Sequence, residues 1–172
     1  MKKFGPTQII AVFILLGIIT TLFSQRPVLA QNQEINLIQQ FVWKPKWDAI
    51  VSQNNSELNV LVETNRTDRI YSRAYLPIQI NITNNNSLLF NLEYATLSHV
   101  GNATFRSEVR DNLTNKILWM STLKDTNGQL SNNTFTLPSD TLNRPVEFRF
   151  VIITNGTGQH SMDVKKAIVS FK

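Results

Sequence analysis

Apolar and polar residues alternate along most of the chain from Leu58 onward, and this period of two is typical of strands that bury one face. In the first such segment Leu58, Val60 and Val62 share one side. The same alternation predicts six further strands, at residues 78–83, 88–97, 103–110, 116–123, 146–152 and 162–171.

Turn-forming residues separate these segments, as in Asn127-Gly128 and in the run Asn155–Gly158. No stretch of this region has a long helical period. Two sheets that are each apolar on one face must bury those faces against each other. The pattern therefore predicts an all-β fold, an antiparallel two-sheet β-sandwich with its core in residues 58–172.

Residues 31–57 are less regular, and we expect them to form an irregular N-terminal segment of the same domain. Glu34–Val42 fits either a short helix or an edge strand. Pro45 interrupts any regular element in the next few residues, because it lacks a backbone N–H.

Residues 1–30 have the order of a secretory signal peptide. Lys2 and Lys3 precede the apolar run Ile9–Phe23, and Val28-Leu29-Ala30 offers a small-residue cleavage site. The 15 residues of the run would span about 22 Å as a helix, less than the roughly 30 Å of a bilayer core. Cleavage after Ala30 is the expectation, and an uncleaved anchor is the alternative that would bring the protein to a membrane.

The same segment resembles the leader of pilins and archaellins, because Lys2, Lys3 and Gly5 stand just before the apolar stretch. Such proteins retain the stretch as a helix in a filament core. Pro6 and the pair Arg26-Pro27 count against this interpretation, since proline ends or distorts a helix.

Eight Asn-x-Ser/Thr triplets come after the predicted signal peptide, and such triplets accept N-linked glycans outside the cytoplasm. They begin at Asn54, Asn65, Asn81, Asn85, Asn102, Asn112, Asn132 and Asn155. The chain has no cysteine, so the exported domain must be stable without disulfides. This combination suggests a glycoprotein of an archaeal cell surface, and an Asn-rich surface without sugar is the alternative.

The formal charge of +5 overstates how basic the exported domain is, because Lys2, Lys3 and Arg26 belong to the signal segment. The remaining basic residues are scattered singly or in pairs. Nucleic-acid binding requires a clustered basic surface, so nucleic acid is excluded as a partner.

Four stretches resemble the later strands of galactose-binding-like jelly-roll modules, the β-sandwich type of many carbohydrate-binding modules. They are residues 89–111, 116–119, 134–138 and 146–171. The resemblance implies a module that binds carbohydrate or another surface ligand at end loops or on a sheet face. Many such modules hold calcium, but no acidic cluster of this sequence matches a calcium loop, and no metal or cofactor is expected.

Trp43 and Trp47 are the best candidates for stacking on a sugar ring, because they stand in the irregular segment. Arg106, Arg110 and Arg149 could clamp a carboxylate or sulfate if their strands are neighbours. The alternatives are core packing for the tryptophans and a solvated salt-bridge face for the arginines.

Catalysis has little support, because the chain has only two histidines, His99 and His160. A hydrolase would need Asp140, Asp163 or Glu147 within hydrogen-bond reach of His160. The sequence favours a non-catalytic module at the cell envelope with a glycan or an envelope protein as partner. A filament or envelope-layer subunit that retains its N-terminal helix is the alternative.

Overall fold

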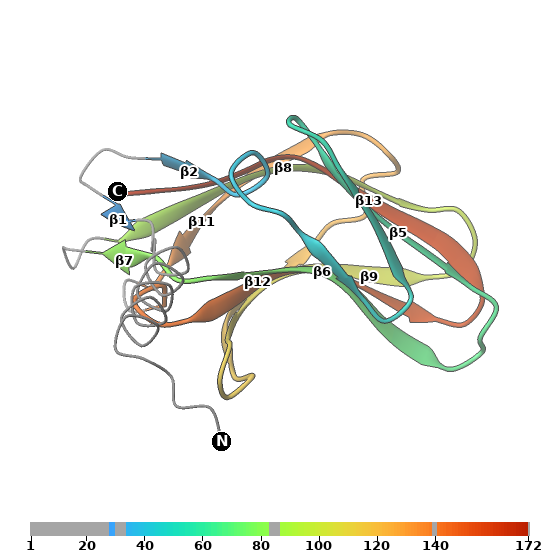
Figure 1. Ribbon diagram of the computed structural model, residues 1–172. Helices are drawn as coiled ribbons and strands as arrows, with labels where there is room; N and C mark the ends of the chain where they lie inside the picture. Colours follow the sequence, from blue (N-terminus) through green and yellow to red (C-terminus); the bar gives the residue numbers. More distant parts are fainter. Residues whose placement is uncertain (1–27, 30–33, 83–86, 139–140, 172) are drawn as a thin grey trace, which may run out of the picture.

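The computed structural model describes residues 28–29, 34–82, 87–138 and 141–171, and within them the strands form two antiparallel sheets that lie face to face (Figure 1). The five-stranded sheet has the order β10 (Ile117–Leu123), β9 (Ala103–Asp111), β12 (Val146–Asn155), β6 (Arg69–Ile78) and β3 (Lys44–Lys46). The six-stranded sheet has the order β11 (Ser131–Leu137), β8 (Leu88–Ser98), β13 (Gly158–Phe171), β5 (Leu58–Thr64) and β4 (Ala49–Gln53), with β2 (Glu34–Asn36) also paired to β13. The predicted all-β sandwich is confirmed.

Two shorter strands, β1 (Val28–Leu29) and β7 (Asn81–Ile82), form a parallel pair. Apart from β1, the predicted signal segment lies outside the described residues. Within the described ranges no helix has the length and apolar character needed to cross a membrane.

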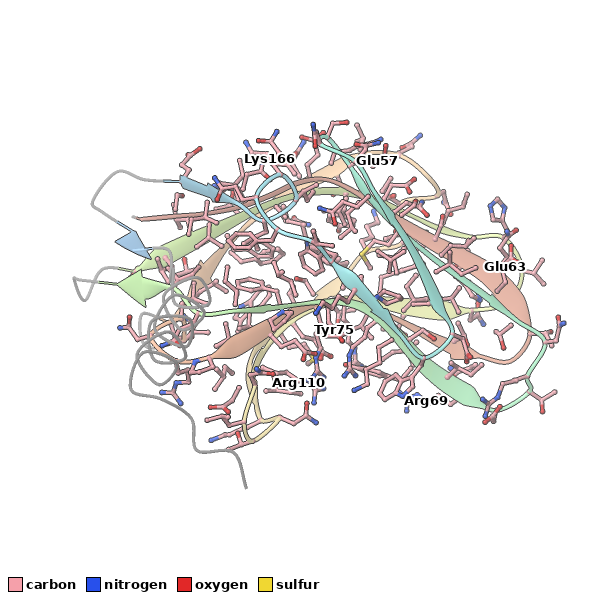
Figure 2. All side chains as sticks on the ribbon, in the orientation of Figure 1. Glu57, Glu63, Arg69, Tyr75, Arg110 and Lys166 are labelled. Atoms are coloured by element: carbon pink, nitrogen blue, oxygen red, sulfur yellow. The ribbon has the colours of Figure 1, made fainter. Side chains whose placement is uncertain are left out.

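Alternation along the strands sends one set of side chains between the sheets, where they fill the interior in Figure 2. Phe148 of β12 is 1% exposed, and its ring centroid lies 5.6 Å from that of Phe90 on the opposite sheet. Trp119 packs edge-on against Phe90 at 6.0 Å and is partly buried against the core. Aromatic side chains in a largely aliphatic core therefore connect the two sheets.

One predicted strand was placed wrongly. The expected strand at residues 78–83 is replaced by β6, which ends at Ile78, and by the short β7. The pattern in β6 was hard to recognise because Ser72 and Ala74, which occupy its inner face, are small and Ser72 is polar.

The predicted turn at Asn127-Gly128 is present, with φ values of 52° and 79°. Both residues adopt the left-handed conformation that Asn and Gly tolerate best. In the irregular segment, only Glu34–Asn36 of the stretch Glu34–Val42 forms a strand, β2, and a turn follows it, while β3 and β4 add short edge strands. These short strands carry residues 44–47 to the edge of the five-stranded sheet.

Candidate functional site

The outer face of the five-stranded sheet carries a group of charged side chains. Inward packing of the aromatic residues of β12 leaves Glu147 and Arg149 on the opposite side of that strand. The register places Arg149 between Tyr75 of β6 and Glu108 of β9. Figure 2 labels Tyr75 and Arg110 on this side, away from the six-stranded sheet. The charged face is defined here as Tyr71, Arg73, Glu108, Arg110, Glu147 and Arg149.

Hydrogen bonds connect the members of this charged face. Glu108 Oε2 accepts from Arg110 Nε at 2.8 Å and from the Tyr71 hydroxyl at 2.6 Å. Glu147 Oε1 accepts from Arg149 Nε. Each glutamate therefore binds an arginine from its own strand, and the two strands, β9 and β12, are neighbours in the sheet.

The β9–β10 hairpin extends this network through Asn115. Arg149 Nη2 donates to Asn115 Oδ1 at 2.7 Å, and Arg110 Nη1 donates to its carbonyl oxygen at 3.2 Å. Asn115 has φ 59°, and Asp111 Oδ1 accepts from the backbone of Leu113 at 2.9 Å within the same turn. The hairpin therefore fixes two guanidinium groups in position.

The charged face is buried although it points away from the core. Glu108 is 0% exposed, and Arg73 and Arg149 are 4% exposed. Buried charges are tolerated when they are paired, and here three arginines face two glutamates. Burial, followed by the charge of Arg149, lowers the pKa of Arg73. Burial and the hydrogen bond to Glu108 raise the pKa of Tyr71. The group has one positive charge in excess.

Trp47 stands at the edge of this face, in the turn between β3 and β4. It is 57% exposed and has φ 59°, a left-handed conformation that is uncommon for a bulky residue. Its ring meets Tyr71 edge-on at 5.3 Å, and Cζ of Arg73 lies 4.5 Å from the ring centroid. Backbone strain of this kind is concentrated at functional sites. Here the strained turn places an exposed indole beside the charged face.

A shallow pocket of about 250 Å³ opens next to this indole. Its lining consists of Trp47, Asp48, Arg66, Arg69, Ile70 and Tyr71. Aromatic walls with a few polar groups are typical of small-molecule sites, and this volume is just below their usual range of about 300–1,000 Å³.

Comparison with known proteins supports the fold. No protein-family model and no curated protein matches the chain. The CBM22-1 xylan-binding domain of Xyn10C from Paenibacillus barcinonensis gives a TM-score of 0.53 at 9% identity, over 83% of this chain and 97% of that domain. The module CBM1 of BiXyn10A gives 0.53 at 6% identity, over 84% of this chain and 100% of the module. The chain has the jelly-roll fold of carbohydrate-binding modules.

The same fold also occurs within an enzyme. The enzymatically active domain of tailspike protein 4 from bacteriophage CBA120 gives a TM-score of 0.52 at 7% identity, over 82% of this chain and 20% of that one. Identities this low establish a shared fold, and the site itself must carry any argument about function.

The structure brings four of the five candidate ligand residues to one face. Trp47, Arg110 and Arg149 belong to the site described above, and Arg106 lies further along β9, where its Nη1 is 3.7 Å from the sulfur of Met120. Trp43 does not belong to the site, because it is 4% exposed and stacks on Phe150 in the core at 4.8 Å. Its burial leaves no ring face for a ligand.

Several residues of the site were not among the predicted ligand residues, and Arg73 and Asn115 are two of them. Arg73 lies on β6, most of which was not predicted as a strand. Its neighbours Tyr71 and Tyr75 share its face, and this outward series at every second position was the available signal. The role of Asn115 could not be predicted from the sequence, because it depends on how the β9–β10 hairpin folds back.

Neither Asp163 nor Glu147 hydrogen-bonds to His160 in the described part of the chain. His160 is 1% exposed, and its Nδ1 has no hydrogen-bond partner among the described residues. Asp163 accepts instead from Asn59, and Glu147 lies on the other sheet with Arg149. Asp140 falls outside the described residues. No group of three His, Cys, Asp or Glu side chains suited to a metal ion occurs in the described part of the chain.

The candidate glycosylation sites that the structure describes all lie at the surface. The exposed asparagines are Asn54, Asn65, Asn102, Asn112, Asn132 and Asn155. The side chain of Asn81 and the whole of Asn85 fall outside the described residues. At one end of the sandwich Asn155 donates its backbone N–H to the carbonyl of Asn102 at 3.4 Å, so two of the triplets begin side by side.

Proposed function

We propose that this protein is a non-catalytic carbohydrate-binding module whose ligand lies against Trp47 and the neighbouring charged face. The observation that carries the proposal is the exposed Trp47 indole, held in a strained left-handed turn beside Tyr71. A large amphipathic ring that is kept in water at a cost in backbone energy suits stacking on the apolar face of a sugar.

Binding would need no chemical step. The Trp47 ring supplies a stacking surface, and the pocket beside it accepts one sugar ring. Arg110 and Arg149 are held by Glu108, Glu147 and the β9–β10 hairpin. Arg149 is 4% exposed and so supports the network, whereas Arg110, with a side chain that is 16% exposed, is the guanidinium of this pair that a ligand can reach.

A non-catalytic role is supported by the environment of the histidine that a hydrolase would use. His160 is 1% exposed, and burial lowers its pKa. Neither Glu147 nor Asp163 hydrogen-bonds to it. A general base requires a partner that orients it and access to substrate, and His160 has neither among the described residues.

Replacement of Trp47 by glycine tests the proposed site. Glycine tolerates φ 59°, so it removes a strain of about 1–2 kcal/mol, which offsets the lost ring contacts of about 0.5–1.5 kcal/mol. The variant should stay folded and bind polysaccharide at least about tenfold more weakly, or about 1.4 kcal/mol. Affinity electrophoresis with xylan, β-glucan and pectic polymers would measure the change.

Asn127→Gly is the matched control, since it places glycine in another exposed left-handed turn position, with φ 52°. Its binding should equal that of the unaltered protein. If Trp47→Gly binds as tightly as this control, the proposed site is wrong.

We also propose that the module is exported, cleaved after Ala30 and glycosylated, and that it acts at the cell surface with residues 31–57 and 58–172 as one domain. Exposure of the six described triplet asparagines supports glycosylation, because an acceptor must be accessible. The intact mass of the protein from its own cells, before and after deglycosylation, tests both points. A mass that begins at Gln31 and falls on deglycosylation is expected.

A membrane-anchored or filament subunit is the second candidate, motivated by the apolar run Ile9–Phe23. A mass that retains this run would favour it. A mass that does not change on deglycosylation would mean that the triplets carry no sugar.

A further inference from the structure

Positive charge and aromatic rings are interleaved along the edge of the five-stranded sheet. On β6 every second residue from Arg69 points outward, and β3 aligns Lys46 with Arg73 and Lys44 with Tyr75. The β3–β6 stripe is defined here as Lys44, Lys46, Trp47, Arg69, Tyr71 and Arg73. Four of its six members are cations and none is acidic.

Arg73 has an ion-pair partner but no hydrogen bond for its Nε donor among the described residues. Its side chain is 5% exposed, and its nearest carboxylate oxygen, Glu147 Oε1, lies 3.6 Å from Nε. That oxygen already accepts from Arg149, and Arg73 Nε has no hydrogen-bond partner among the described residues. The donor is therefore left unsatisfied beneath the Trp47 ring.

An unsatisfied buried donor is unfavourable, and arginine cannot escape by losing its proton at ordinary pH. The lowered pKa of Arg73, caused by burial and then by the charge of Arg149, indicates the same lack of compensation. Only an added negative charge or acceptor would satisfy it. The exposed Lys44, Lys46 and Arg69 increase the positive potential around it.

We propose that the ligand is a polysaccharide of uronic acids, with a sugar ring stacked on Trp47 and its carboxylate drawn to the cations of the β3–β6 stripe. This inference rests on the proposed carbohydrate-binding function and narrows its ligand class. A carboxylate is planar and accepts two parallel hydrogen bonds from a guanidinium, so it matches the exposed Arg69 better than a neutral hydroxyl does, while the buried Arg73 contributes its charge.

The test compares polymers that share a backbone and differ in charge. The mature glycoprotein from its own cells is titrated with polygalacturonate and with the fully methyl-esterified polymer, which has no carboxylates. We expect the charged polymer to bind at least about tenfold more tightly, and raised salt to weaken its binding alone. Dextran sulfate is the third probe and should bind more weakly than polygalacturonate.

Variants then locate the charge requirement. Lys44→Gln with Lys46→Gln removes two exposed cations of the stripe without disturbing the buried network. Lys165→Gln with Lys166→Gln removes two exposed cations from the opposite sheet and is the matched control, with Lys166 on the far layer in Figure 2. The first pair should lose about tenfold in affinity for polygalacturonate, and the control should lose little.

Arg69→Gln removes a third exposed cation of the β3–β6 stripe. The test therefore needs no substitution of the buried Arg73. Equal binding of the esterified polymer, tighter binding of dextran sulfate, or an equal loss in the control pair would overturn the inference. If only neutral polymers bind and Trp47→Gly abolishes that binding, the carbohydrate-binding function stands and the uronate assignment fails. If no polysaccharide binds, both fail.

Discussion

Replacement of Trp43 by alanine should be among the most destabilising single changes in the domain. The indole is 4% exposed and stacks on Phe150 at 4.8 Å. Its Nε1–H donates to the carbonyl of Leu37 at 3.0 Å, and its backbone N–H donates to Gln53 Oε1 at 2.9 Å. Trp43 therefore fastens the segment after β2 to the core.

Three contributions set the magnitude. Removal of a large buried aromatic side chain costs about 3–5 kcal/mol through lost burial and the cavity that remains. The carbonyl of Leu37 then loses its buried partner, which costs about 1–3 kcal/mol. The contributions overlap, so we expect Trp43→Ala to lower the free energy of unfolding by about 4–6 kcal/mol, a large part of the 5–15 kcal/mol typical of a domain.

Trp43→Phe separates these contributions, because a phenyl ring preserves stacking on Phe150 and removes only the N–H donor and part of the volume. The Trp43→Phe variant should lower the free energy of unfolding by about 1–3 kcal/mol. Urea unfolding followed by far-ultraviolet circular dichroism measures both variants without depending on tryptophan fluorescence. A loss below about 1 kcal/mol for Trp43→Ala would refute the structural role assigned to this side chain.

Two other changes test the core and its titration. Phe148→Ala, at the contact with Phe90, should cost about 3–5 kcal/mol in urea unfolding, and a loss under about 1 kcal/mol would contradict the assigned inner face of β12. Burial lowers the pKa of His160 below the ordinary value of 6.5, so the unfolded chain binds more protons as the pH falls below 6.5. The free energy of unfolding should therefore decrease as the pH is lowered from 6.5 to that lowered pKa. In the His160→Gln variant it should decrease less steeply over the same range, and equal slopes would show that another group is responsible.

The sequence pattern predicted most strands of the two sheets but only part of the candidate site. The alternation at Val146, Phe148 and Phe150 is unbroken, so the inner and outer faces of β12 could be assigned correctly. The edge strand β11 was not among the strands predicted by alternation. Most of its residues are polar, because the outer side of an antiparallel edge strand can remain in water. Strand prediction from alternation therefore fails where inner-face residues are small or most residues are polar, as in β6 and β11.

The two tryptophans of the irregular segment illustrate what spacing alone leaves open. Trp43 and Trp47 are four residues apart with Pro45 between them, and both were plausible ligand residues. The fold turns Trp43 into the core against Phe150 and leaves Trp47 57% exposed beside Arg73. The difference arises from the left-handed turn at Trp47, which reverses the chain between β3 and β4.

By itself the sequence determined the fold class, because alternation requires two half-apolar sheets to bury their inner faces whatever their order. It also determined that Glu147 and Arg149 share one side of a strand, since the period of two is a property of the backbone. Only the tertiary structure decided that β12 lies between β9 and β6, which brings Glu108 and Arg73 to the same face. Strand order depends on pairing between distant segments, and local sequence patterns do not encode which segments become neighbours.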